Sequence, residues 1–186
     1  MDKENLSENQ KEKNVQEIEI LQSFSLENLN NILDLEKKCF PPEWQYPDGE
    51  EYYTEILKDK ENISIFLKEN NGIVGYILAR FHNKEIEELS EYDSEFKNQE
   101  KVFYINTIGV LPEKRGTGGA KKLLIAVCEE AKKRGIEKFS IHARTLNDFN
   151  EKLKKIFENN ISVIRKIEKW EPAQGEPYEY IEWIYK

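Results

Sequence analysis

The stretch that decides the fold is residues 102–135, VFYINTIGVLPEKRGTGGAKKLLIAVCEEAKKRG. Its first nine residues are rich in β-branched and aromatic side chains, carry no charge and stop before Leu111-Pro112, which predicts a strand over 102–110. A helix over about 121–134, ending at Gly135, is predicted by apolar residues at helical spacing: Leu123, Leu124, Val127, Cys128 and Ala131. A glycine-rich loop joins the two elements.

The loop has the features of a phosphate-binding turn. A helix N-terminus presents unpaired N–H groups at the positive end of the helix dipole, and glycines let that backbone close on a phosphate. Lys114, Arg115, Lys121 and Lys122 add positive charge around it. The glycines alone favour an ordinary tight turn, but the order strand, glycine–arginine loop, amphipathic helix favours a pyrophosphate site.

Two common phosphate motifs do not match this loop. A Walker A loop ends in Gly-Lys-Ser/Thr, and the dinucleotide fingerprint requires a third glycine where Lys121 stands. The loop instead resembles the acyl-CoA loop of the GNAT superfamily of N-acetyltransferases, whose signature is Arg/Gln-x-x-Gly-x-Gly/Ala. Arg115, Gly118 and Ala120 occupy its fixed positions. The resemblance is strong over 104–135 and consistent in order from about residue 18 onward.

The rest of the chain fits the same topology. Apolar patterns predict helices at about 26–40, 50–58 and 147–158 and strands at 18–24, 63–67, 73–81, 137–143, 161–167 and 178–185. The resulting order, β-α-α-β-β-β-α-β-α-β-β, is similar to that of GNAT proteins. The resemblance implies an α/β (α+β) fold with a mixed, mostly antiparallel, twisted sheet of about seven strands and helices on both faces. We expect a flexible polar tail over 1–16 and one domain over 17–186.

Composition narrows the function classes. The chain has 186 residues and a net charge of −8, which argues against a nucleic-acid partner and permits, without showing, a cationic substrate. Cys39 and Cys128 have apolar neighbours, so we expect buried, reduced thiols, and no Cys/His spacing indicates a metal. The apolar runs are too short for a membrane span and the first residues are polar, so we expect a cytoplasmic protein. Trp183 and Tyr185, expected on an edge strand, suggest a homodimer contact.

The resemblance also implies a reaction and its cofactor contacts. GNAT enzymes transfer an acetyl group from acetyl-CoA directly to an amine, without a metal. The thioester oxygen would meet backbone N–H groups around Ile108, Gly109 and Val110. The pyrophosphate would contact Arg115, Gly116, Thr117, Gly118, Gly119 and Ala120. In the helix at 147–158, the family has an Asn that contacts CoA and a Tyr that faces the sulfur. Asn150 fits with Phe157 in the Tyr position, and Asn147 fits with Lys154 there.

The sequence leaves several candidates for the groups that transfer protons. Simple alternation places Val102, Tyr104, Asn106 and Ile108 on the strand face that carries a Glu or His in many family members. Tyr104 and Asn106 are poor bases at pH 7 but could hold a water. Glu100 is the nearest carboxylate, and Tyr180 or Tyr178 could replace the missing tyrosine as the acid, or the thiolate leaves to solvent. His82, at the end of its strand, could face the same cleft, but a lone histidine at a strand end is more often solvated or structural, and we expect a structural role for His142 too.

Two further segments have alternative interpretations. Residues 83–100 hold seven acids against Lys84 and Lys97, which favours a solvated insertion; the alternative is an acidic rim that attracts a cationic amine. Trp44 and Tyr46 either line the substrate pocket or pack over the edge of the core.

Two functions are therefore compared. One is an N-acetyltransferase that acts on a primary amine of a small molecule or on a protein or peptide amino group. The other is a non-catalytic acyl-CoA-binding module of the same fold. The net charge of −8 disfavours a nucleic-acid-directed or toxin-type member of the family.

Overall fold

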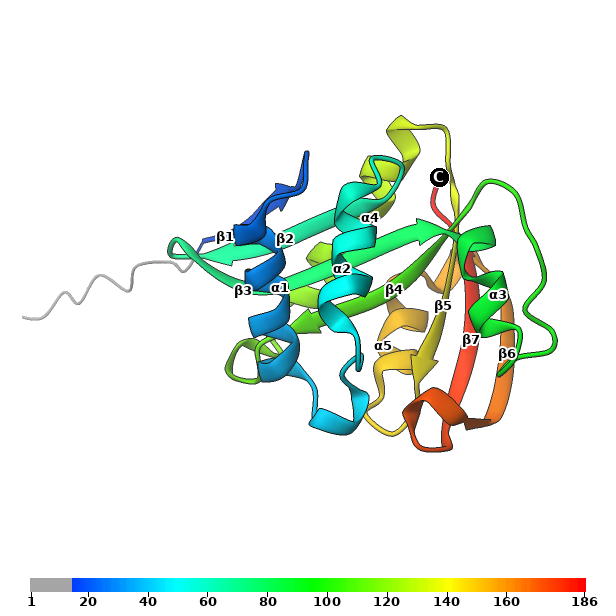
Figure 1. The fold of residues 1–186 in the computed structure, drawn as a ribbon. Helices are drawn as coiled ribbons and strands as arrows, with labels where there is room; N and C mark the ends of the chain where they lie inside the picture. Colours follow the sequence, from blue (N-terminus) through cyan, green and yellow to red (C-terminus); the bar gives the residue numbers. More distant parts are fainter. Residues whose placement is uncertain (1–14) are drawn as a thin grey trace, which may run out of the picture.

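One seven-stranded sheet forms the centre of the protein (Figure 1). The computed structural model describes residues 15–186, and the strand order is β1-β2-β3-β4-β5-β7-β6. The strands are β1 (Gln16–Ile20), β2 (Ile63–Glu69), β3 (Gly72–Phe81), β4 (Val102–Val110), β5 (Lys138–Arg144), β6 (Ile161–Trp170) and β7 (Glu176–Ile184). Only β4 and β5 are parallel neighbours; the other pairs are antiparallel. The predicted mixed, mostly antiparallel sheet is confirmed.

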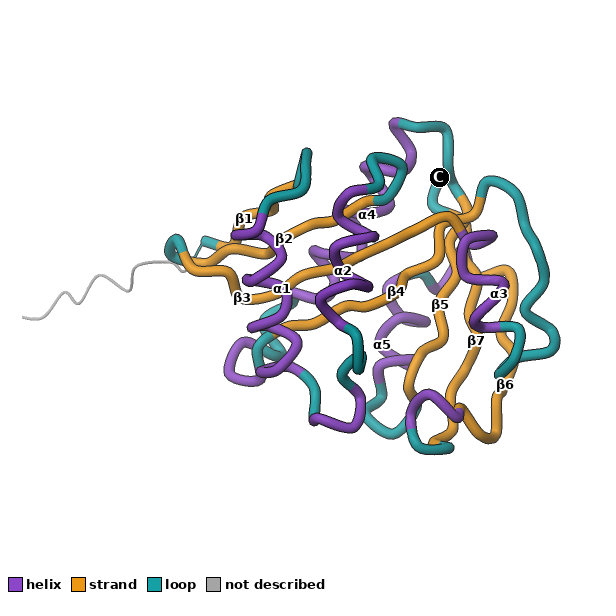
Figure 2. The backbone as a smooth tube through the Cα atoms, in the orientation of Figure 1, coloured by secondary structure: helices purple, strands orange, loops and turns teal. Residues whose placement is uncertain are grey.

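Helices cover both faces of the sheet, as predicted. The helices α1 (Leu26–Cys39) and α2 (Gly49–Lys58) lie on one face, and α4 (Gly119–Lys133) and α5 (Phe149–Ile156) lie on the other (Figures 1 and 2). A short helix that the sequence did not predict, α3 (Ile86–Leu89), lies on the α1–α2 side over the β5–β7 end of the sheet. Ser25 caps the N-terminus of α1, because the Asn28 N–H donates to Ser25 Oγ at 3.0 Å.

Three apolar clusters hold these layers together. The largest lies between the sheet and α4–α5 and includes Phe103, Ile105, Leu124, Val127, Phe139 and Trp183. The second lies under α1 and α2 and includes Ile32, Tyr53, Ile56, Phe66 and Tyr76. The third, called here the α3 cluster, comprises Leu89, Phe96, Tyr104, Trp170, Ala173 and Tyr180. Each large side chain buried in this way contributes about 1.5–3 kcal/mol to stability.

Three boundaries or positions differ from the sequence predictions. Gln16 belongs to β1, and the rest of the expected tail lies almost wholly outside the described residues. The strand β7 is not at the edge of the sheet, because β6 returns outside it. Trp183 is fully buried and stacks on Phe157, with ring centroids 4.7 Å apart, so the dimer contact expected from it loses its basis. Cys39 and Cys128 are buried and unpaired, as predicted.

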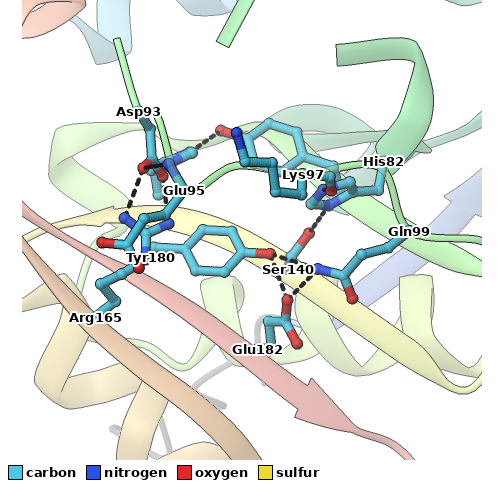
Figure 3. A network of polar contacts seen from close by, with 11 residues as sticks. His82, Asp93, Glu95, Lys97, Gln99, Ser140, Arg165, Tyr180 and Glu182 are labelled. Carbon is cyan, nitrogen blue, oxygen red and sulfur yellow. Dashed lines mark hydrogen bonds and ion pairs between the residues drawn. The ribbon is translucent and has the colours of Figure 1, made fainter. Parts of the chain in front are cut away.

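His82 anchors the segment that links β3 to β4. Its ring is fully buried; Nδ1 lies 2.8 Å from Ser140 Oγ and Nε2 lies 3.0 Å from the Lys97 carbonyl oxygen (Figure 3). Burial lowers the pKa of His82 to about 4, so the ring is neutral at pH 7. A carbonyl can only accept, so Nε2 carries the proton and Nδ1 accepts from Ser140.

Acid should therefore weaken the fold through His82. Because the pKa of His82 falls from 6.5 when unfolded to about 4 when folded, its stabilising effect is complete above pH 6.5 and is lost toward pH 4. The corresponding loss is up to about 3 kcal/mol. Urea unfolding of the wild type and His82→Gln from pH 7 to 4.5 should show their difference in unfolding free energy shrinking as the pH falls. A difference that stays constant with pH would contradict this assignment.

Candidate active site

The site begins where β4 leaves β5. The two strands pair only over Val102–Tyr104 and Lys138–Ser140, and then diverge (Figure 1). On its other side β4 stays paired with β3, but Leu78 faces Thr107 while Ala79 faces Ile105, so Asn106 is the extra residue of a β-bulge. A bulge bends its strand and increases the local twist. The bulge thus lies next to the point of divergence and opens the sheet there.

Beyond the bulge, each β4 side chain lies on the opposite face of the sheet from the one that simple alternation predicts. Tyr104 belongs to the α3 cluster, whereas Ile108 packs against the α4–α5 core together with Phe103. The expected common face of Tyr104 and Ile108 is therefore wrong, because the extra residue shifts the alternation by one position.

The backbone beyond the bulge faces the opening. The Leu111 N–H donates to Val74 on β3 at 2.9 Å, while the Val110 carbonyl accepts instead from Arg115 Nε at 3.1 Å. Because successive residues of a strand direct their polar groups to opposite sides, Ile108 and Val110 turn theirs toward the open side and Gly109 toward β3. Two of the three expected carbonyl-binding positions therefore have N–H groups in the opening.

The glycine loop leads from this opening to an uncapped helix. The N-cap of α4 is Gly118, with a φ of +87°, and no side chain caps the first turn. L-residues with side chains rarely adopt that φ, so glycine is required for the loop to turn here. Ala120 lies in that first turn, Thr117 Oγ1 donates to the Lys114 carbonyl at 2.8 Å, and Gly116 also has a positive φ of +80°. The free N–H groups of this turn form an anion-binding arrangement.

The basic residues around the loop differ in what they can do. Lys114 forms an ion pair with Glu69. Arg115 donates to two backbone carbonyls, those of Val110 and Cys39, at 3.1 and 2.9 Å. Lys121 and Lys122 are exposed and so are the two cations most available to an anion at the helix N-terminus.

Aromatic residues from the α1–α2 connection border the other side of the opening. Asn106 Nδ2 donates to Tyr52 Oη at 3.1 Å, and the Tyr52 ring stacks on Tyr46 with centroids 4.1 Å apart. Trp44 packs under the Arg144 guanidinium at 3.9 Å, at the end of β5. Tyr46 therefore packs on α2 beside Asn106, and Trp44 bridges the two sides of the site.

Tyr104 is linked to a buried chain of polar groups. Its hydroxyl lies 2.9 Å from His142 Nδ1, and His142 Nε2 lies 3.0 Å from Asp93 Oδ2. Although burial opposes it, hydrogen bonds from His142 and Arg165 hold the pKa of Asp93 well below its usual range. Burial lowers the pKa of His142, so the neutral ring donates from Nε2 to Asp93 and accepts the Tyr104 proton at Nδ1. Burial raises the pKa of Tyr104, which keeps the hydroxyl protonated.

Other expected site residues lie elsewhere. Tyr180 pairs with His142 on β5, but its hydroxyl donates at 2.6 Å to Glu182, which pairs with Ser140 on the part of β5 that is still paired with β4 (Figure 3). Glu100 is exposed before the paired start of β4, and Phe157 lies in the core. The structure does not bring Glu100 or Phe157 to the divergence, and the hydroxyl of Tyr180 is already engaged by Glu182.

The two alternative asparagines on or near α5 have local partners. The Asn147 side chain accepts from the Phe149 N–H at 3.1 Å, and Asn150 Nδ2 donates to Glu179 at 2.9 Å. Asn147 is exposed and Asn150 is buried. No contact in the structure selects one of them for the cofactor.

Sequence reasoning missed two buried carboxylates near the site. Glu85 and Asp93, taken for solvated acids of the 83–100 segment, are only 3% and 5% exposed. The solvated interpretation is wrong for these two residues because the α3 cluster folds the segment back onto the sheet. Only Ile86 and Leu89, spaced for a short buried helical turn, could have indicated it.

A model of the acetyltransferase (GNAT) family matches residues 29–158, more than half of the sequence. The chain belongs to the GNAT family. No curated protein matches it significantly. Within residues 15–186, none of the helices is both long and apolar enough to cross a membrane, and no three His, Cys, Asp or Glu residues are grouped to hold a metal ion.

Solved structures share the fold of this GNAT chain at low identity. Ribosomal-protein-S18-alanine N-acetyltransferase from Escherichia coli is 14% identical with a TM-score of 0.64, over 92% of this chain and 96% of that one. Arabidopsis thaliana NAA60 in complex with acetyl-CoA is 18% identical with a TM-score of 0.67, over 90% and 99%. Arabidopsis thaliana Naa50 in complex with the bisubstrate analogue CoA-Ac-MVNAL is 20% identical with a TM-score of 0.62, over 89% and 97%.

Close packing at Gly109 can be tested by substitution. A Cβ atom there would lie 2.7 Å from the ring of buried Tyr76, whereas one at Gly72 would meet nothing closer than 3.5 Å. Gly109→Ala should therefore lower the free energy of unfolding by about 1–3 kcal/mol, and Gly72→Ala should change it by less than about 1 kcal/mol. Urea unfolding of both variants measures this, and equal effects would show that Gly109 has room for a side chain.

Proposed function

We propose that this GNAT chain transfers the acetyl group of acetyl-CoA to a primary amine, either of a small molecule or of a protein or peptide. The observation that carries the proposal is the continuity of the opening between β4 and β5 with the uncapped N-terminus of α4. One arrangement thus offers N–H donors for a carbonyl at one end and for phosphates at the other.

The residues present fit acetyl-CoA. The open first turn of α4, with its glycines and the exposed Lys121 and Lys122, would hold the pyrophosphate over residues 115–120. The N–H groups of Ile108 and Val110 would donate to the thioester oxygen. Donors fixed in place before the reaction stabilise negative charge that develops there. Bound acetyl-CoA supplies the activated acetyl group.

Tyr104 and Asn106 would position the acceptor. Because the Tyr104 proton is donated to His142, the hydroxyl oxygen can accept a hydrogen bond from an amine. Asn106 stands at the bulge, and its Oδ1 is buried with no hydrogen-bond partner. Both side chains thus present acceptor oxygens, which suits an N–H donor.

The similar structures support a protein or peptide amino group as one acceptor. One is named for the alanine of ribosomal protein S18, and another holds the bisubstrate analogue CoA-Ac-MVNAL. Asn147 and Asn150 remain alternative cofactor contacts.

The phosphate end of the site can be tested at one glycine. Gly118→Glu places a carboxylate at the N-terminus of α4, and Gly135→Glu places one just beyond its C-terminus. Both glycines have positive φ and no atom within 4 Å of an added Cβ, so the two variants carry similar backbone strain. Calorimetric titration with acetyl-CoA should show binding weakened at least about tenfold in Gly118→Glu only, since the charge repels phosphate there. Equal binding by both variants would place the phosphates elsewhere.

Transfer to an amine separates the enzyme from a binding module. Wild-type protein should release CoA and form an N-acetyl product with at least one member of a panel of alkylamines and peptides, as followed by mass spectrometry. Acetyl-CoA binding without transfer to any panel member would favour the non-catalytic acyl-CoA-binding alternative.

A further inference from the structure

A buried carboxylate lies beside the acceptor side of the opening and has too few partners. Glu85, in the turn His82–Glu85 that follows β3, is 3% exposed. Its Oε1 lies 3.2 Å from Arg80 Nη1, but the atom makes no hydrogen bond. A buried carboxylate normally has several hydrogen bonds, so the unfilled acceptor at Oε1 points to a donor that arrives from outside.

The charges around Glu85 do not balance. Arg80 is shared, because its Nη2 also pairs with Glu55 on α2 at 2.6 Å. The adjacent Lys84 is engaged by Asp59 and Glu61, at 2.5 and 2.9 Å. Arg80, Glu55 and Glu85 together therefore carry one net negative charge, with Glu88 on α3 adding to the negative field. A bound cation would neutralise this charge.

The remaining neighbours of Glu85 suit an ammonium group. After burial, the negative charge of Glu85 is a further cause of the raised pKa values of Tyr46, Tyr52 and Tyr104, and Asn106 connects the two groups because its Nδ2 donates to Tyr52 Oη at 3.1 Å. The Asn106 side chain hydrogen-bonds Glu85, and the Oδ1 atom of the same amide is buried without a hydrogen-bond partner. Carboxylate and amide oxygens accept N–H bonds, and tyrosine rings attract cations through their faces.

We infer that Glu85 binds the ammonium form of the acceptor and removes its proton. The inference rests on the proposed acetyl transfer and narrows its acceptor to an alkylamine that is protonated at neutral pH. One proton passes from the ammonium nitrogen to the Glu85 carboxylate, which becomes a carboxylic acid and later releases the proton to solvent. The freed lone pair of the nitrogen forms the C–N bond as the C–S bond breaks, and the second nitrogen proton leaves with the thiol.

The electrostatics of the site agree with this role. Burial raises the pKa of Glu85, although Arg80 and the Asn106 amide partly oppose the rise. A carboxylate with a raised pKa is a better proton acceptor than one in water. The pKa values of Tyr46, Tyr52 and Tyr104 are all raised, mainly by burial, so these hydroxyls remain neutral.

The test compares two acceptors that differ in charge. At pH 7.5 2-phenylethylamine is an ammonium ion, whereas phenylhydrazine is neutral and needs no deprotonation before attack. In Glu85→Gln, kcat/KM should fall about 100-fold for 2-phenylethylamine and less than about threefold for phenylhydrazine. Glu91→Gln, which removes an exposed carboxylate of the same 83–100 segment, should match the wild type on both. Equal losses on both acceptors would overturn the inference.

Two measurements separate this inference from the proposed function. Titration of CoA-loaded protein with 2-phenylethylammonium chloride should show binding at least tenfold weaker in Glu85→Gln, while acetyl-CoA affinity and the urea midpoint stay near wild type. Absence of ammonium binding by the wild type would overturn the inference even if acetyl transfer occurs. Ammonium binding lost in Glu85→Gln, with no transfer to any amine, would uphold the Glu85 site and instead reject the proposed function.

Discussion

The extra residue at Asn106 is the constraint on which the site depends. A regular β4 would continue beside β5 and satisfy its own backbone, leaving no donor for a ligand. The bulge bends β4 after only three paired positions, so Ile108 and Val110 turn unpaired N–H groups into a gap inside the sheet. The same residue directs its amide toward Tyr52 on α2. One irregularity thus opens the cofactor side and sets the acceptor side.

Two buried carboxylates near this gap illustrate how hydrogen-bond and ion-pair partners set the pKa of a carboxylate. Asp93 receives two hydrogen bonds from Arg165 and one from His142, which outweigh burial and lower its pKa. Glu85 shares Arg80 with Glu55, and burial raises its pKa. Asp93 is therefore a fixed anion that orients His142 and, through it, Tyr104. The raised pKa of Glu85 lies closer to neutral pH than that of an ordinary carboxylate, so Glu85 is better able to exchange a proton.

The elements with strong periodicity were predictable, and the exceptions have local causes. The strand–loop–helix unit over 102–134 was foreseen because its hydrophobic period and its turn residues agree. The sheet face on which Ile108 lies could not be predicted, because nothing in a run of strand-forming residues marks the position of a bulge. The interior position of β7 depends on β6 returning outside it, which is a tertiary choice. Glu85 was misjudged because a run of acids conceals which member is buried.

Arg115 shows that a residue can match a binding motif and still have a structural role. Arg115 stands at the first fixed position of the acyl-CoA signature, yet its guanidinium donates to Val110 on β4 and to the last residue of α1, Cys39. It therefore ties the strand bordering the cofactor side to the helix leading to the acceptor side. Hydrogen bonds from a charged donor are worth about 1.5–3 kcal/mol. In this chain the helix N–H groups suit the phosphates, and the arginine holds the loop that presents them.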